Sequence, residues 1–249
     1  MAKLKLEEVK KYIEENIGSF HEARENSLRE LKLSTILLKK NPYLFKAKNI
    51  LTADILVRNL VSAYLSSQEE TMFGTFLERL AIFICEKVYT GKKSSAEGID
   101  LEFEKDGVLY IVAVKSGTNW GNASQIAKMR ENFRKAKQRL RTNAKRIPVE
   151  VINGCCYGRV VKTDKGEYHK IAGQHFWEFI SNNSDLYTEI IEPLGHKAKE
   201  RNKKFDVVYS QLLNIFTSQF INEFCVDGII DWNKLVKFNS GKEKMKVNL

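Results

Sequence analysis

The sequence has little cysteine and histidine and no long apolar segment, and each shortage excludes a class of protein. No run of about 18 uncharged apolar residues is present, which excludes a membrane-spanning helix. The four cysteines lack CxxC spacing, so we expect buried, reduced thiols rather than disulfides or a zinc site. His169 and His175 lack a second histidine at the spacing of metal ligands. The N-terminal MAKLKLEEVKK lacks the apolar core of a secretory signal, and we expect a cytoplasmic protein.

The composition favours a globular protein with a polyanionic partner. A length of 249 residues suits one large domain, or a catalytic domain with helical additions. Hydrophobic residues make up 43% of the chain, which is ample for a core. The formal net charge of +10 favours binding to a polyanion, although many soluble proteins are equally basic.

The stretch 98–117, GIDLEFEKDGVLYIVAVKSG, predicts a β-hairpin. Asp106-Gly107 supplies the positive φ angles that a type I′ turn requires. Closing that turn places Asp100 opposite Ala113. Because side chains alternate with period two, Lys115 then lies on the same face as Ala113 and next to Asp100. The hairpin therefore brings a carboxylate and an ammonium group together at one end.

Two interpretations of this pair are open. It can be a surface salt bridge at a sheet edge, which would contribute little stability. However, Lys115 ends the apolar run 110–114, which is typical of a central strand and a poor place for a solvated lysine. The loop SGTNWGN and a strongly basic helix follow it. An aspartate, a strand pair, a lysine and a helix form a pattern that resembles the PD-(D/E)xK nucleases.

The resemblance to PD-(D/E)xK nucleases implies a role for each residue of the pair. Asp100 would bind a divalent metal ion, Mg²⁺, together with the backbone carbonyl of Val114. Lys115 would orient and help to deprotonate the attacking water. The chain departs from the pattern at Ile99, which replaces a proline, and at Ala113, which replaces the second carboxylate. The second departure matters more.

The layout of the chain from about residue 41 onwards resembles type II restriction endonucleases, closest to the subfamily that cuts interrupted GC-rich palindromes of the RGGNCCY kind. That subfamily also lacks an acidic residue two positions before its lysine. The landmarks are Asn41-Pro42, FGTFLE at 73–78, Ile99-Asp100, VKSG at 114–117, Tyr157-Gly158 and AGQHFWEFISN at 172–182. The resemblance implies a restriction enzyme, but it does not give the recognition sequence.

Residues 71–89 predict an apolar helix with a conspicuous carboxylate, Glu78. A carboxylate in so apolar a helix needs a partner or a metal ion. Gly74 gives the spacing GxxxE, which many nucleases of the resembled superfamily show beside the active site. We therefore expect Glu78 to supply the carboxylate that Ala113 lacks, as a catalytic and metal-binding residue. The alternatives are that Glu78 pairs with Arg79 or Lys87, or is solvated. Glu102 is the competing second metal ligand.

Residues 124–144 predict a basic helix that begins at Ser124 as its cap. Glu131 is the only acidic residue opposing its cations, and such density favours contacts with DNA phosphates. An inward stripe of Ala127, Phe133, Ala136 and Leu140 is expected. Gln125 lies in the first turn, where it either touches the scissile phosphate or a metal-bound water, or is plain polar surface. The candidate DNA contacts are Gln125, Lys128, Arg130, Arg134, Lys137 and Arg141.

The remaining segments predict an α/β fold with a restriction-endonuclease-like core, a mixed central sheet flanked by helices, and helical additions at both ends. A helical region over 1–70 is expected to be interrupted near Gly18-Ser19, with a connection over 40–51. The nuclease core spans 71–183. A helical region over 184–249 follows, in which 205–226 is a buried helix with possible dimer contacts.

The sequence-based prediction is a Mg²⁺-dependent, homodimeric type II restriction endonuclease that cuts double-stranded DNA. The hairpin and the basic helix by themselves predict only a metal-dependent nuclease site near DNA. Two alternatives stay open: a repair or junction nuclease of the same superfamily, and a catalytically inactive DNA-binding module. Ala113 is the main observation in favour of the inactive module.

Overall fold

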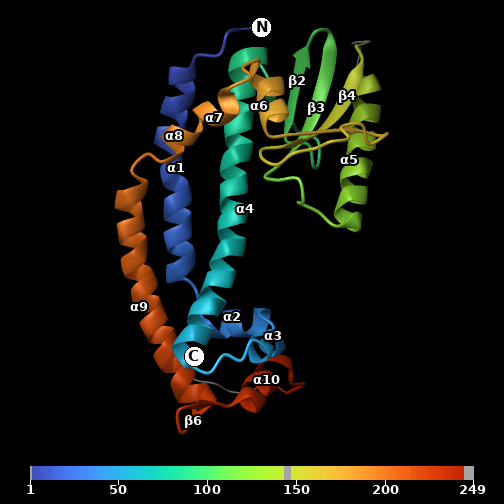
Figure 1. Cartoon of the computed structure of the whole chain (residues 1–249). Coiled ribbons are helices and arrows are strands. Elements are labelled where there is room, and N and C mark those ends of the chain that lie inside the picture. The colour runs from blue at the N-terminus through green and yellow to red at the C-terminus, as the bar shows by residue number, and fades with distance from the viewer. Residues whose placement is uncertain (1, 143–146, 244–249) are drawn as a thin grey trace. The chain divides into compact units, whose positions relative to one another are not determined.

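The computed structural model describes residues 2–142 and 147–243, except for the side chains of residues 141 and 142. It contains two compact units. The first combines the described residues up to Gly18 with Phe73–His196, and the second combines Ser19–Met72 with the described residues from Lys197 onwards. The helices are α1 (Leu6–Arg29), α2 (Leu33–Lys39), α3 (Pro42–Ala47), α4 (Ala53–Tyr89), α5 (Ala123–Thr142), α6 (Gln174–Ser181), α7 (Leu186–Glu189), α8 (Ile191–Leu194), α9 (Ala198–Phe224) and α10 (Trp232–Ser240) (Figure 1).

The first unit is built on a mixed five-stranded sheet in the order β1-β2-β3-β4-β5. Its strands are β1 (Lys92–Lys93), β2 (Leu101–Lys105), β3 (Val108–Lys115), β4 (Val149–Cys155) and β5 (His169–Ala172). β1, β2 and β3 pair antiparallel, whereas β3, β4 and β5 pair parallel. The prediction of a mixed central sheet flanked by helices is confirmed, and β3 lies at its centre.

The hairpin of β2 and β3 has the predicted register. Asp106 and Gly107 have φ angles of 52° and 76°, as a type I′ turn requires. Lys105 pairs with Val108, and Leu101 pairs with Val112. Turn chemistry therefore fixes which side chains meet at the open end of the hairpin.

Helix α5 covers one face of the sheet, and a run of apolar side chains seals the contact (Figure 1). Met129, Phe133 and Ala136 are buried there against strand residues such as Ile111 and Val151. The inward position predicted for Ala127 is wrong, because Ala127 is exposed and Met129 takes that place. Position 129 is four residues before Phe133 and lies on the same helical face, whereas position 127 does not.

Helices α6 and α4 contribute to the opposite face. Phe176 approaches β4 so closely that a Cβ at Gly154 would lie 2.3 Å from its ring, which explains the glycine. Phe103 of β2 stacks on Tyr89 at the end of α4, with ring centroids 5.1 Å apart. The burial predicted for Phe176, Trp177 and Ile180 of α6 is confirmed.

Three local predictions for the N-terminal region are wrong. Helix α1 continues through Gly18-Ser19 without interruption. Residues 42–47 form helix α3 rather than a connection, because Asn41 caps the amides of Tyr43 and Leu44 and a proline is favourable in the first turn. The helix expected over 71–89 is the C-terminal part of one 37-residue helix, α4, which begins at Ala53.

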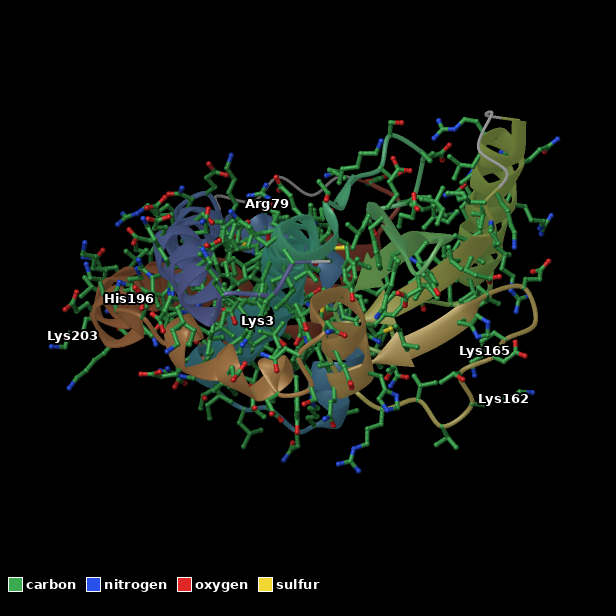
Figure 2. The ribbon with its side chains drawn as sticks, turned by 90° about the horizontal axis from the view of Figure 1, so that it is seen from above. Lys3, Arg79, Lys162, Lys165, His196 and Lys203 are labelled. Atoms are coloured by element: carbon green, nitrogen blue, oxygen red, sulfur yellow. The ribbon has the colours of Figure 1, made fainter. Side chains whose placement is uncertain are left out.

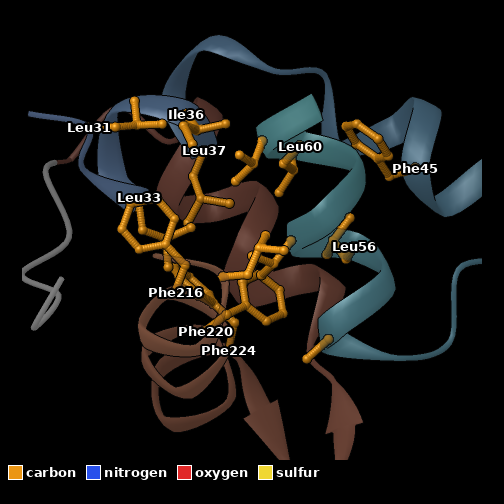
Figure 3. Close-up of a cluster of buried hydrophobic side chains, with 14 of the residues drawn as sticks. Leu31, Leu33, Ile36, Leu37, Phe45, Leu56, Leu60, Phe216, Phe220 and Phe224 are labelled. Carbon is orange, nitrogen blue, oxygen red and sulfur yellow. The ribbon is translucent and has the colours of Figure 1, made fainter. Parts of the chain in front are cut away.

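The second unit has an apolar core of its own (Figure 3). Leu33, Ile36 and Leu56 are buried there with Phe220 and Phe224 of α9. The buried helix predicted over 205–226 ends at Phe224.

After α9, residues 225–230 form a small hairpin, β6 (Cys225–Val226) with β7 (Ile229–Ile230), where only helix was expected. Its turn is Asp227-Gly228, with φ angles of 49° and 77°. The sequence signal is the same Asp-Gly pair that predicts the larger hairpin.

Candidate active site

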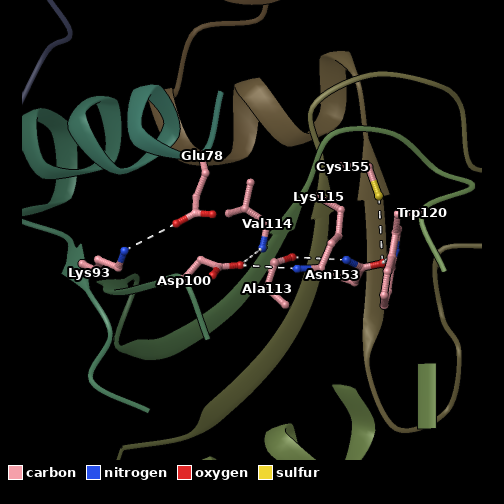
Figure 4. Close-up of polar contacts among 9 residues, drawn as sticks. All are labelled: Glu78, Lys93, Asp100, Ala113, Val114, Lys115, Trp120, Asn153 and Cys155. Carbon is pink, nitrogen blue, oxygen red and sulfur yellow. Dashed lines mark hydrogen bonds and ion pairs between the residues drawn. The ribbon is translucent and has the colours of Figure 1, made fainter. Parts of the chain in front are cut away.

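Asp100 and Lys115 meet at the open end of the β2–β3 hairpin (Figure 4). Asp100 lies directly before β2, and its backbone N–H donates to the carbonyl of Val112 at 2.9 Å. Its Oδ2 accepts the backbone N–H of Val114 at 2.7 Å and lies 3.8 Å from Nζ of Lys115. Both side chains are partly shielded, with 18% and 31% of their surface exposed. The predicted proximity of these two side chains is confirmed.

The backbone carbonyl of Val114 lies on the Asp100 side of β3. A strand residue directs its N–H and its C=O to the same neighbouring strand, and the N–H of Val114 donates to Asp100. The residues on either side direct their carbonyls the other way: Ala113 accepts from Asn153, and Lys115 accepts from the N–H of Cys156. One carboxylate and one carbonyl oxygen therefore face the same space beside Lys115.

Glu78 approaches the same place from helix α4. A Cβ at Gly74 would lie 2.4 Å from Oγ of Ser116, so α4 passes close to the end of β3 one turn before Glu78. Figure 4 shows Glu78 directed from α4 toward Asp100 and Val114. Among the described residues its ion-pair partner is Lys93 at 3.6 Å, and neither Arg79 nor Lys87 pairs with it.

The environment of Glu78 disfavours its charge. Burial and the nearby Asp100 carboxylate raise the pKa of Glu78, and the cations Lys93 and Lys115 counteract this only in part. Two carboxylates of the same sign therefore converge beside one lysine. A bound cation would relieve this repulsion.

The competing carboxylate, Glu102, is engaged elsewhere. It pairs with Lys92 of β1 at 3.2 Å, and only 11% of its side chain is exposed. Within the part of the chain that the structure describes, no three His, Cys, Asp or Glu side chains are close enough together to hold a metal ion. A cation at this site would therefore need ligands other than side chains, namely main-chain oxygen or water. Glu78, Asp100 and the Val114 carbonyl together could supply two carboxylates and one main-chain oxygen.

Two residues beside Lys115 have no part in the sequence-based prediction. The ring of Trp120 lies beneath Nζ of Lys115, 5.4 Å from the ring centroid, and its Nε1 donates to Oδ1 of Asn153 at 3.1 Å. The available signals were a tryptophan in the polar loop SGTNWGN and an asparagine inside the apolar strand VEVINGCC. Neither signal indicates by itself that the two residues touch.

The four cysteines are free, as expected, and three of them are buried. Burial raises the pKa of Cys155 to about 11, so this thiol beside the site is protonated at neutral pH. Among the described residues, no helix has the length and apolar character needed to cross a membrane.

The sequence model of a family described as type II restriction endonuclease EcoO109I matches residues 7–202, which include the sheet and every residue of the site. The chain belongs to this family. Members of the EcoO109I family are type II restriction endonucleases, so the chain is a sequence-specific DNA endonuclease, a hydrolase of phosphodiester bonds whose family generally uses divalent metal ions. No curated protein matches the chain.

The cations of helix α5 have more acidic partners than Glu131, the one partner expected from the sequence. Lys128 pairs with Glu97 at 3.4 Å and with Glu131 at 3.9 Å. Arg130 and Arg134 both pair with Glu167, at 3.6 and 3.5 Å. The prediction that Glu131 alone opposes these cations is wrong, because Glu97 and Glu167 approach from other segments.

The start of α5 also differs from prediction. Asn122, not Ser124, caps the helix: its Oδ1 accepts the N–H of Gln125 at 3.0 Å, and Oε1 of Gln125 accepts the N–H of Asn122 at 3.0 Å. This reciprocal capping box occupies Gln125 at the helix end. Lys137 is half-buried, and the side chain of Arg141 lies outside the described residues.

Proposed function

We propose that this EcoO109I-family enzyme cleaves double-stranded DNA at a Mg²⁺ site formed by Asp100, Glu78 and the backbone carbonyl of Val114, with Lys115 as the residue that positions the attacking water. The observation that carries the proposal is the convergence of these groups at one end of β3. It is the arrangement expected of a PD-(D/E)xK nuclease in which a helix supplies the second carboxylate in place of Ala113.

The donor set suits Mg²⁺. This ion prefers oxygen ligands and is usually held by one or two carboxylates and several waters. Asp100 is oriented by two backbone hydrogen bonds, and the pKa of Glu78 is raised by burial and by the nearby Asp100 carboxylate. When bound, the ion polarises the scissile phosphate, stabilises the charge that develops on it and favours ionisation of a coordinated water.

The proposed role of Lys115 is to act on the attacking water rather than to stabilise the core. Its ammonium group lies 3.8 Å from Asp100 and retains N–H donors for a water molecule or a phosphate oxygen. The ion pair thus keeps the ammonium group of Lys115 next to the carboxylate of Asp100. The lysine then orients the water in line with the phosphorus atom and compensates for negative charge as the bond to the leaving oxygen breaks.

Helix α5 and the segment after β4 are the proposed DNA-binding elements. α5 begins after the loop that follows Lys115, and Asn132 in its middle lies against Gly98, two residues before Asp100. Lys137 lies about 18 Å further along the axis than Gln125 at ~1.5 Å per residue. Lys162 and Lys165 lie on the segment between β4 and β5 and are exposed (Figure 2). Phosphate contacts from such residues position the duplex without reading its sequence.

The recognition site is expected to be a short palindrome cut by a homodimer. A two-fold symmetric DNA site matches two-fold protein symmetry, with each subunit cutting one strand. The resemblance to enzymes that cut RGGNCCY supports an interrupted GC-rich site.

Digestion of plasmid DNA with Mg²⁺, followed by sequencing of the fragment ends, tests the proposal. Discrete fragments with one shared end sequence are expected from the wild type, and none from Lys115→Ala. Nicks at cruciforms or flaps would instead indicate a structure-specific nuclease. DNA binding without cleavage across Mg²⁺, Mn²⁺ and Ca²⁺ would indicate the inactive binding module.

A further inference from the structure

Asn153 and Trp120 form a buried polar contact behind Lys115. Asn153 lies on β4 directly beside Ala113 and is 0% exposed. Its Nδ2 donates to the carbonyl of Ala113 at 3.2 Å, and its Oδ1 accepts from Nε1 of Trp120 at 3.1 Å. Both ends of one buried amide are therefore used, one on the central strand and one on the loop after it.

A buried asparagine in a parallel strand needs a reason. Strands covered on both faces favour valine and isoleucine, and an amide buried without hydrogen bonds costs free energy. The indole N–H of Trp120, directed inward, is the shorter of the two contacts to Oδ1 of Asn153, the other being the weak thiol donor of Cys155 at 3.9 Å. The consequence is a fixed orientation of the Trp120 ring.

The loop that carries Trp120 is also held at other points. Nζ of Lys170, on β5, donates to the carbonyl of Thr118 at 2.7 Å. The N–H of Tyr157 donates to the carbonyl of Ser116 at 2.9 Å, and the Tyr157 ring covers Gly117 so closely that a Cβ there would lie 2.5 Å away. Strand β5 and the segment that follows β4 thus hold residues 116–118, and the ring face of Trp120 is presented to Lys115.

We propose that Trp120, oriented by Asn153, is a positioning residue for Lys115. This inference rests on the proposed role of Lys115 in cleavage. The long lysine side chain has many rotamers, and Asp100 contacts its ammonium from one side only. A ring face attracts an ammonium group from a second side without accepting a strong hydrogen bond. The lysine is thereby held in place while its N–H donors stay available to water and phosphate.

Single-turnover cleavage at saturating DNA tests this proposal with two variants. Trp120→Leu removes the ring and the indole N–H, and we expect a rate lower by about 10- to 100-fold, the size of a misplaced catalytic group. Trp120→Phe keeps a ring face but loses the hydrogen bond, and an intermediate rate is expected. Affinity for cognate DNA, measured with Ca²⁺ in place of Mg²⁺, should be unchanged in both.

The matched control is Trp232→Leu. Trp232, in the second unit, also lies beneath a lysine, with Lys46 Nζ 5.5 Å from its ring centroid. This variant removes the same kind of pair away from the site, and we expect cleavage at the wild-type rate. A loss equal to that of Trp120→Leu would show that the effect is general destabilisation and would overturn the proposal.

Fluorescence tests the contact directly. Lys115→Met removes the ammonium group but keeps the length of the side chain, so the emission of Trp120 should change. The same substitution in a Trp120→Phe background should leave emission unchanged. An identical change in both backgrounds contradicts the proposed contact.

Asn153→Val covers the case in which Trp120→Leu does not fold. If Asn153 acts through Trp120, Asn153→Val should slow the wild type but add little to Trp120→Phe, whose hydrogen bond is already absent. Independent, multiplicative effects of the two substitutions would overturn the relay. An active Lys115→Ala enzyme would refute the proposed function itself, whereas an inactive Lys115→Ala with a fully active Trp120→Leu would refute only this inference.

Discussion

The carboxylate of Asp100 accepts the backbone N–H of Val114 at 2.7 Å, across the open end of the hairpin. This contact fixes the aspartate relative to the strand that ends in Lys115, independently of the 3.8 Å ion pair between the two side chains. It also sets the Val114 carbonyl on the same side as the carboxylate. The proposed metal-binding pair is thus oriented by main-chain geometry, and in the proposed mechanism the lysine serves the reaction.

Lys115→Ala should abolish cleavage while leaving the fold intact. A partly exposed ion pair contributes at most about 1 kcal/mol, so the melting temperature should change little. Lys105→Ala is the matched control on the same hairpin, about 23 Å away at ~3.3 Å per residue. Lys105 donates to the carbonyl of Phe179 at 3.3 Å and lies over the ring of Tyr89, so its loss should lower stability but not activity. Near wild-type cutting by Lys115→Ala would show that the site is assigned to the wrong residues.

Glu78→Gln should slow single-turnover cleavage by at least ~100-fold, which is roughly 2.7 kcal/mol at the transition state, and should raise the Mg²⁺ concentration needed for half-maximal rate. The shape of the side chain is kept and only its charge is lost, so cognate DNA binding should persist. The paired variant is Glu102→Gln, whose carboxylate already pairs with Lys92 at 3.2 Å. It should cut nearly as the wild type does.

The opposite result of this comparison is equally informative. If Glu102→Gln is impaired and Glu78→Gln is not, then the second metal ligand comes from the hairpin and Glu78 is structural. A Mg²⁺ titration of both variants in parallel separates these outcomes, because only a ligand changes the metal dependence as well as the rate.

Glu78→Gln should also make the metal-free protein more stable than the wild type at neutral pH. Burial and Asp100 raise the pKa of Glu78 in the folded chain. The stability that Glu78 contributes is therefore fully present below the ordinary glutamate pKa of 4.5 and is lost as the pH rises through the raised folded value. The Lys93 pair offsets little, since Lys93 is 70% exposed.

Thermal melts in EDTA across the acidic to neutral range measure this difference. The melting temperatures of wild type and Glu78→Gln should coincide below the ordinary glutamate pKa and separate above it, with the variant higher. A wild type that is the more stable protein at neutral pH would contradict the raised pKa.

The sequence predicts what local chemistry determines. Asp106-Gly107 sets the hairpin register, and the register alone places Asp100 beside Lys115. Helix α3 and the β6–β7 hairpin were also locally encoded, by the Asn41 cap with Pro42 and by Asp227-Gly228. Both signals lie in short segments between stronger helical patterns. The sequence therefore predicts a connection in place of α3, and helix in place of the β6–β7 hairpin.

Contacts between distant segments could not be predicted in the same way. Glu167 lies more than 30 positions from Arg130, and only the packing of β5 beside β4 brings it to α5. Asn153 and Trp120 are likewise joined across a strand and a loop. Polar residues inside apolar strands indicate that a partner exists, but tertiary packing decides which one.

The active enzyme is expected to be a homodimer. Val207 and Ile221 are 58% and 45% exposed on α9, and their separation of 14 residues is close to four helical turns, which puts them on one face. Sedimentation at cutting concentrations on cognate DNA should give two subunits per site. Val207→Lys with Ile221→Lys should weaken dimerisation, and Lys203→Ala on the same helix should not. A monomer that cuts to completion excludes the homodimer.

Glu167→Gln should strengthen DNA binding. Glu167 pairs with both Arg130 and Arg134, so these arginines must give up that carboxylate before they can contact phosphate. Each phosphate contact contributes about 0.9 to the slope of log K against log salt, so freeing one should steepen the slope by about that amount, and Arg134→Ala should flatten it.

The measurement is affinity for non-cognate duplex at several salt concentrations. Lys203→Ala, which removes one exposed positive charge from α9, should leave the slope unchanged. If Glu167→Gln and Arg134→Ala both behave like Lys203→Ala, this part of α5 does not contact the DNA backbone.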